Sequence, residues 1–143
     1  MSRRIAFRNA ALFDSRKGVM RRGATVIVEG GRIALVGGKA LAVGGAKVYD
    51  LKGKALLPGL IDCHVHVTAV DHDVLRLSLQ PPSLIAAQAK DVLRGMLLRG
   101  FTTVRDACGA DFGLQEAVER GIFEGPRLFI AGWPLTQTGG HGD

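Results

Sequence analysis

The chain has 143 residues, of which 47% are hydrophobic and 22% are charged, so its length and composition favour a packed globular domain and exclude a disordered chain. Its 19 Lys and Arg residues outnumber 13 Asp and Glu residues, which gives a formal charge of +6. Because the basic residues are scattered and form no run or single helical face, we expect no nucleic-acid partner.

Short β signals fill the first part of the chain. The sequence ATVIVEGGRIALVGG, residues 24–38, places two apolar runs on either side of Gly30-Gly31, a dipeptide that a tight hairpin turn accepts. The sequence KVYDLKGKALLPG, residues 47–59, repeats the pattern with a turn at Lys52-Gly53. We therefore predict a small antiparallel sheet over residues 1–56.

The pattern changes after the break at Pro58-Gly59, because apolar runs now alternate with helical segments. This alternation is typical of β-α-β units around a parallel sheet. The sequences LIDCHVHV (60–67), FTTVRDAC (101–108) and PRLFIAG (126–132) predict three strands.

Two helices are predicted between these strands. Residues 83–99 should form a helix that Ser83 caps and that ends before Gly100. A short helix is expected at 114–121. The face of the longer helix that should meet the core consists of Ile85, Ala89, Val92, Met96 and Leu97.

Two histidines stand one residue apart at the end of the first of these strands. Because side chains alternate along a strand, His64 and His66 should share a face with Asp62, and the two histidines lie about 6.6 Å apart. Neutral imidazoles at this spacing can converge on one metal ion, with the remaining ligands supplied by other strands. The alternative is a pair that only forms hydrogen bonds in a half-buried strand. A position at the C-terminal end of a parallel strand favours the metal site.

Three segments resemble one known family. LPGLIDCHVH (57–66) resembles the start of the first barrel strand of the amidohydrolase superfamily, the metal-dependent hydrolases typified by urease, dihydroorotase and imidazolonepropionase. RGFTTVRDACGAD (99–111) resembles the second strand. EGPRLFIAG (124–132) and LTQTGGHGD (135–143) resemble the third strand and the following loop in the prolidase-like dipeptidase branch.

The resemblance implies an α/β fold. Residues 1–56 would be part of a small β-sandwich, and residues 57–143 would be the first three β/α units of a (β/α)8 TIM barrel that is incomplete in this chain. Because three strands leave sheet edges exposed, we expect an N-terminal fragment. Because most of the metal ligands would lie on later strands, we expect this fragment to be inactive alone. Missing sequence or another chain would supply the remaining strands, and the complete protein is expected to be a homo-oligomer.

The resemblance also implies a chemistry. His64 and His66 would bind a divalent metal, with zinc expected and one or two ions in the site, and metal-activated water would hydrolyse an amide or peptide bond. The small-molecule substrate would be Xaa-Pro or another dipeptide, or an N-acyl amino acid. The general base is expected beyond Asp143 and cannot be named. A cyclic-amide hydrolase or deaminase of the same superfamily is the alternative. A small metal-binding or basic interaction module is the alternative of another class.

Several further residues carry expectations. Asp62 should accept a ring N–H from a metal-binding histidine, or pair with a basic side chain at the barrel floor. His141 should contact substrate, with an exposed loop histidine as the alternative, and Asp143 shares that alternative. Arg105 and Asp106 should have structural roles.

We expect the other polar and aromatic candidates to take no part in binding or catalysis. His72 should be a solvated loop residue and Trp133 a packing residue. Cys63 and Cys108 fit neither a disulfide framework nor a paired metal motif and should pack as small apolar groups. No apolar stretch is long enough for a signal peptide or for the roughly 20 residues of a membrane span, so we expect a cytoplasmic protein.

Overall fold

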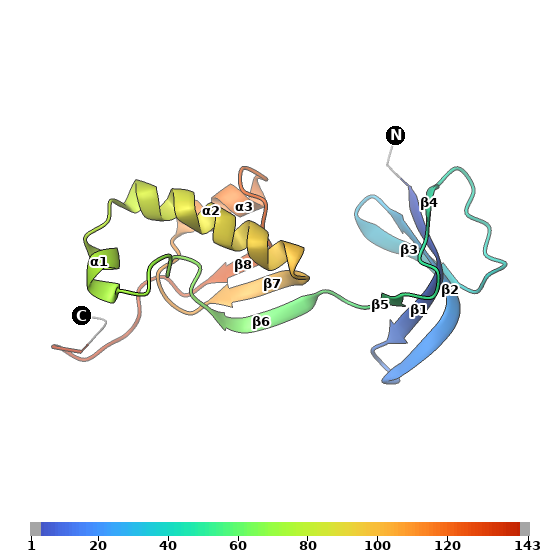
Figure 1. The fold of residues 1–143 in the computed structure, drawn as a ribbon, viewed down its shortest axis with the longest axis horizontal. Coiled ribbons are helices and arrows are strands. Elements are labelled where there is room, and N and C mark those ends of the chain that lie inside the picture. Colours follow the sequence, from blue (N-terminus) through green and yellow to red (C-terminus); the bar gives the residue numbers. More distant parts are fainter. Residues whose placement is uncertain (1–3, 141–143) are drawn as a thin grey trace. The chain divides into compact units, whose positions relative to one another are not determined.

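The computed structural model describes residues 4–140 and has a mixed α/β fold (Figure 1). Contacts within the chain divide it into two compact units, residues 1–58 and 59–143. The division expected from the sequence falls two residues earlier. Between residues 4 and 140, every helix is too short or too polar to span a bilayer.

The first unit is a five-stranded sheet. Its strands are β1 (Ile5–Asp14), β2 (Val19–Glu29), β3 (Arg32–Gly37), β4 (Lys47–Asp50) and β5 (Ala55–Leu56). The order is β3-β2-β1-β4, and β5 also pairs with β1. Strands β2 and β3 form the antiparallel hairpin predicted at Gly30-Gly31, where both glycines have positive φ values. Glycine adopts this left-handed conformation without the steric cost that a side chain adds.

The second predicted hairpin is wrong. Strands β4 and β5 do not pair with each other, because each runs parallel to β1. The chain between them also stays on β1: the Leu51 N–H donates to the Arg8 carbonyl at 2.9 Å, and the Gly53 N–H donates to the Asn9 carbonyl at 2.8 Å. The sheet is therefore mixed and not purely antiparallel.

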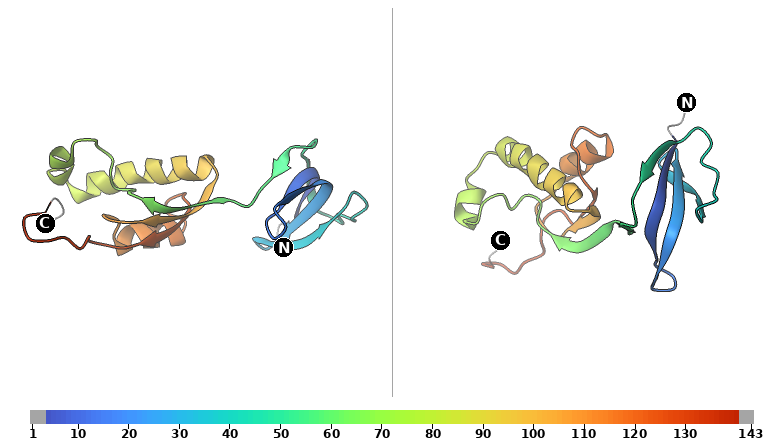
Figure 2. Two further views of the ribbon diagram at one scale, coloured as in Figure 1. Left: turned by 90° about the horizontal axis from the view of Figure 1, so that it is seen from below. Right: turned by 45° about the vertical axis from the view of Figure 1, so that its right-hand side comes forward.

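The second unit alternates strands and helices as predicted. Its elements are β6 (Leu60–Val65), α1 (Val74–Ser78), α2 (Pro82–Leu98), β7 (Phe101–Asp106), α3 (Phe112–Glu119) and β8 (Arg127–Ile130). The three strands form a parallel sheet in the order β6-β7-β8. Helix α2 runs alongside the strands in each view (Figures 1 and 2).

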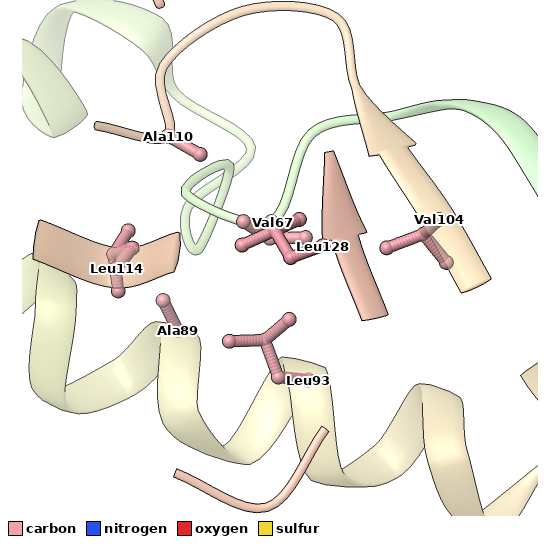
Figure 3. Packing of buried hydrophobic residues seen from close by; sticks show 7 residues of the cluster. All are labelled: Val67, Ala89, Leu93, Val104, Ala110, Leu114 and Leu128. Atoms are coloured by element: carbon pink, nitrogen blue, oxygen red, sulfur yellow. The ribbon is translucent and has the colours of Figure 1, made fainter. Parts of the chain in front are cut away.

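One hydrophobic cluster holds this unit together (Figure 3). Helix α2 contributes Ala89 and Leu93, and α3 contributes Leu114. The sheet contributes Val104 and Leu128. The cluster also contains Val67 and Ala110 from the segments that follow β6 and β7. The ends of these two strands are thus fixed against the core, which matters because the histidine pair lies there.

Helix α2 differs from its prediction in two respects. It begins at Pro82 with Pro81 at the N-cap and no side-chain cap, so the expected Ser83 cap is wrong. Proline suits the first helical position because its φ angle is preset and its missing N–H would have no partner there. The predicted core face missed Leu93, which is fully buried, and included Leu97, which is exposed.

The expectation for Trp133 is also wrong. This side chain is 92% exposed and lies after β8, in a segment without helix or strand. A large aromatic residue often packs in a core, but within the described part of the chain this side chain lies almost entirely in solvent.

Candidate metal centre

The two predicted ligands lie at the C-terminal end of β6. His64 is the second-to-last residue of the strand, and His66 is the first residue after the strand. Both side chains are exposed. Their ring centroids are 5.2 Å apart, with an interplanar angle of 77°. The structure therefore brings the pair together, as the alternation of strand side chains predicts.

A backbone contact orients the second ring. The Nδ1 atom of His66 lies 3.2 Å from the carbonyl oxygen of Cys108, 42 residues away in sequence. A carbonyl oxygen can only accept, so this is a hydrogen bond when Nδ1 carries the proton. The Nε2 atom of His66 then keeps its lone pair. Metal-binding histidines in proteins commonly have this arrangement, in which the second ring nitrogen donates to a carbonyl or carboxylate.

These features fit a divalent cation such as zinc, for which neutral imidazole nitrogen is a good ligand. The fit is partial. Residues 4–140 contain no group of three or more His, Cys, Asp or Glu side chains that could hold a metal. Zinc is usually four-coordinate, so His64 and His66 would supply two of its ligands.

Asp62 contacts the backbone of the histidine strand. Its Oδ1 accepts the backbone N–H of His64 at 3.0 Å, whereas the ring contact of His66 is made by Cys108. The carboxylate therefore holds the main chain at His64, which differs from the ring contact predicted.

Strand β6 has a register shift next to this contact. Asp62 pairs with Val104 and Val65 pairs with Asp106, so β6 has one more residue than β7 between these pairs. Such an extra residue interrupts the hydrogen-bond ladder and the alternation of faces. The face of Asp62 therefore does not follow from counting. The Arg105 Nε donates to the Cys63 carbonyl at 2.8 Å, which satisfies a backbone acceptor at this point.

Arg105 and Asp106 have the structural roles expected of them. Arg105 is exposed and bonds the backbone of β6, while Asp106 is fully buried and accepts three backbone N–H groups. The sequence did not reveal the contribution of Cys108, because a carbonyl group leaves no signal in the residue type.

The remaining predicted residues are placed as follows. His141 and Asp143 lie outside the described residues. His72 is exposed in the loop after β6, as predicted. Cys63 is exposed, so its expected packing role is wrong, whereas Cys108 is half-buried.

The two cysteines are expected to react with iodoacetamide at different rates. Burial, followed by the nearby Asp106 charge, raises the pKa of the Cys108 thiol. Near neutral pH, the fraction of Cys108 present as the reactive thiolate is then smaller than it would be at the ordinary pKa of a thiol. We expect Cys63 to be alkylated first and the difference to narrow as pH rises, as measured by peptide mass spectrometry of timed samples. Cys63→Ser should leave only the slow reaction, and equal rates in the parent chain would contradict this expectation.

Comparison with known proteins identifies the family. The sequence profile described as the amidohydrolase family matches residues 55–143, which is more than half of the chain. The chain therefore belongs to the amidohydrolase family, as the histidine motif and the two following strands indicate.

Individual relatives match only over part of their length. The chain is 36% identical over 92 residues to ochratoxinase of Aspergillus niger, a match that covers 62% of this chain and 19% of that protein. It is 38% identical over 107 residues to imidazolonepropionase of Deinococcus radiodurans, covering 73% and 24%. A prolidase structure in complex with N-methylphosphonate-L-proline superposes with a TM-score of 0.91 at 40% identity, covering 96% and 34%. The chain thus spans about a fifth to about a third of the length of these relatives.

Proposed function

We propose that this chain carries part of the metal centre of a hydrolase that cleaves an amide or peptide bond, in Xaa-Pro or another dipeptide or in an N-acyl amino acid. The observation that carries the proposal is the histidine pair, whose ring centroids lie 5.2 Å apart at the C-terminal end of β6. Membership of the amidohydrolase family supports the reaction class. Similarity to a prolidase structure with a proline-containing ligand supports the substrate class.

The corresponding proposal for the fold is an incomplete TIM barrel. Strands β6, β7 and β8 would be its first three strands, with α2 and α3 as the helices between them. Their parallel pairing in sequence order supports this assignment, because a TIM barrel is built from consecutive parallel β/α units. The first unit would be part of a β-sandwich.

The residues of this chain would have distinct tasks. When bound, the divalent cation, which we propose to be zinc, would activate a water molecule and polarise the scissile carbonyl group. His64 and His66 would hold the cation through ring nitrogens. Cys108 orients the His66 ring through its carbonyl oxygen, and Asp62 fixes the backbone of His64. We assign the general base to no described residue.

A cyclic-amide hydrolase or deaminase is the second candidate. The specific observation in its favour is the 38% identity to an imidazolonepropionase, which extends over 107 residues. Both candidates would use the same histidine pair, so the substrate and not the metal separates them. Homo-oligomerisation and a cytoplasmic location stay predictions.

Zinc titration of the full chain, measured by isothermal calorimetry, tests the metal centre. We expect saturable binding by the parent chain. His64→Ala and His66→Ala should each abolish it, because a single imidazole cannot chelate. His72→Ala is the matched control, since His72 is exposed in the loop after β6, and should bind like the parent. Binding that survives both histidine substitutions would rule out the proposed centre.

The same preparation should show no dipeptide hydrolysis. The described residues supply only two of the ligands that a zinc centre usually has. Metal-dependent turnover by the purified chain would overturn this part of the proposal.

A further inference from the structure

We infer that Asp106 is a positioning residue for the metal centre, because it fixes both chain segments that meet in the His66–Cys108 hydrogen bond. The inference rests on the proposed role of His66 as a metal ligand. Asp106 would act through Cys108 and would not touch the cation itself.

One buried carboxylate joins the two segments. Asp106 is the last residue of β7, and its side chain is fully buried. Its Oδ2 accepts the N–H of Val67, the residue directly after His66, at 2.7 Å. Its Oδ1 accepts the N–H groups of Cys108 at 3.0 Å and Ala110 at 3.1 Å. The chain segments that carry the donor and the acceptor of the His66–Cys108 bond are thus held by the same side chain.

The geometry requires a group that only accepts hydrogen bonds. A carboxylate meets this requirement at both oxygens. Asparagine has the same shape, but its NH2 group would face at least one of the three N–H donors. Because Asp106 is fully buried, water cannot replace a lost bond, and the unpaired N–H would carry its full desolvation cost.

The loop after β7 has a second constraint. Gly109, between Cys108 and Ala110, has a φ angle of +107°, and a Cβ atom there would collide with the Thr68 side chain. The Gly109 N–H also donates to the Gly132 carbonyl at 3.1 Å. The direction of the Cys108 carbonyl therefore depends on the Asp106 bonds on either side of it and on the backbone conformation of Gly109.

The consequence concerns the tautomer of His66. While the Cys108 carbonyl is held in place, the ring carries its proton on Nδ1, and Nε2 is free to bind a cation. If the carbonyl moves, the ring can exchange its proton between the two nitrogens. Only the form with the proton on Nδ1 keeps the Nε2 lone pair free to bind a cation.

The test reads the tautomer of His66 directly. Nitrogen NMR of the full chain with labelled histidine, at about pH 8.5, where a free imidazole is neutral, is expected to show His66 protonated on Nδ1. His66→Ala assigns the signal. Asp106→Asn should convert this signal to that of mixed tautomers and weaken zinc binding by about 10- to 100-fold, the usual loss when a ligand's hydrogen-bond partner is removed. An Nε2-protonated ring in the parent chain would overturn the inference.

Leu93→Ala separates positioning from general destabilisation. Leu93 is buried in the same cluster as Val67 but makes none of the three Asp106 bonds, so this variant should lower stability and leave the tautomer unchanged. If Leu93→Ala shifts the tautomer as much as Asp106→Asn does, Asp106 has only a structural role. If Asp106→Asn fails to fold, Gly109→Ala is a second variant, which retains the Asp106 side chain. We expect it to displace the Cys108 carbonyl and so to mix the tautomers of His66. An unchanged His66 signal in that variant would count against the inference.

The two proposals fail in different ways. A tautomer that responds as expected in a chain that binds no zinc would retain the effect of Asp106 on the His66 ring and end the metal centre, together with any positioning role for it. Zinc binding that needs both histidines, together with an unchanged tautomer and affinity in Asp106→Asn, would retain the metal centre and end the positioning role.

Discussion

His64→Asn and His66→Asn are each expected to abolish dipeptide hydrolysis in a chimaera in which this chain replaces the matching third of the prolidase that superposes with a TM-score of 0.91. The chimaera itself is expected to hydrolyse an Xaa-Pro dipeptide, because under the proposed function the rest of the prolidase would supply the remaining strands and metal ligands. Asparagine is similar in size to part of the imidazole ring but lacks a ring nitrogen for zinc. The loss should exceed the roughly 100-fold effect of removing an outer hydrogen-bond partner. Steady-state assays with added zinc measure it.

The control for this prediction is His72→Asn in the same chimaera. His72 is exposed in the loop after β6, so this variant should keep the activity of its parent. Full activity in both His64→Asn and His66→Asn would remove the basis of the proposed function. A folded, zinc-loaded chimaera that cleaves a cyclic amide and no dipeptide would instead support the second candidate.

Leu93→Ala is expected to destabilise the second unit by about 2–5 kcal/mol, the usual cost of removing a leucine side chain from a packed core. Leu93 is fully buried and lies in the cluster that α2 and α3 form with the sheet. The loss combines the transfer free energy of the removed atoms with the cavity that remains. Urea denaturation followed by circular dichroism gives the change in the free energy of unfolding.

Leu98→Ala is the matched control on the same helix. The Leu98 side chain is 71% exposed at the last residue of α2, so the change should stay within about 0.5 kcal/mol. Equal losses for the two variants would mean that the cluster around Leu93 does not hold the second unit together.

Local patterns were sufficient for much of the fold. The hairpin at Gly30-Gly31 is confirmed. It could be predicted because glycine adopts the left-handed conformation of the turn. The alternation of strands and helices after residue 58 is also confirmed. It could be predicted because the spacing of apolar residues that marks a helix or a strand is set by residues close together in the sequence. The pairing of β4 and β5 with β1 was not predicted, since their partners lie about 40 residues away and compete with a local turn.

The candidate site divides in the same way. The sequence by itself predicted that His64 and His66 lie close together, because residues two positions apart in an extended chain are near neighbours. Only the tertiary structure decided what orients them: the extra residue in β6, the Cys108 carbonyl beside His66 and the buried Asp106 that joins two segments. These contacts join residues about 40 positions apart, and in each hydrogen bond the partner of the side chain is a backbone group, which leaves no signal in the residue type. A pattern of neighbouring residues therefore does not reveal them, and they form only when parallel strands bring their ends to one edge of the sheet.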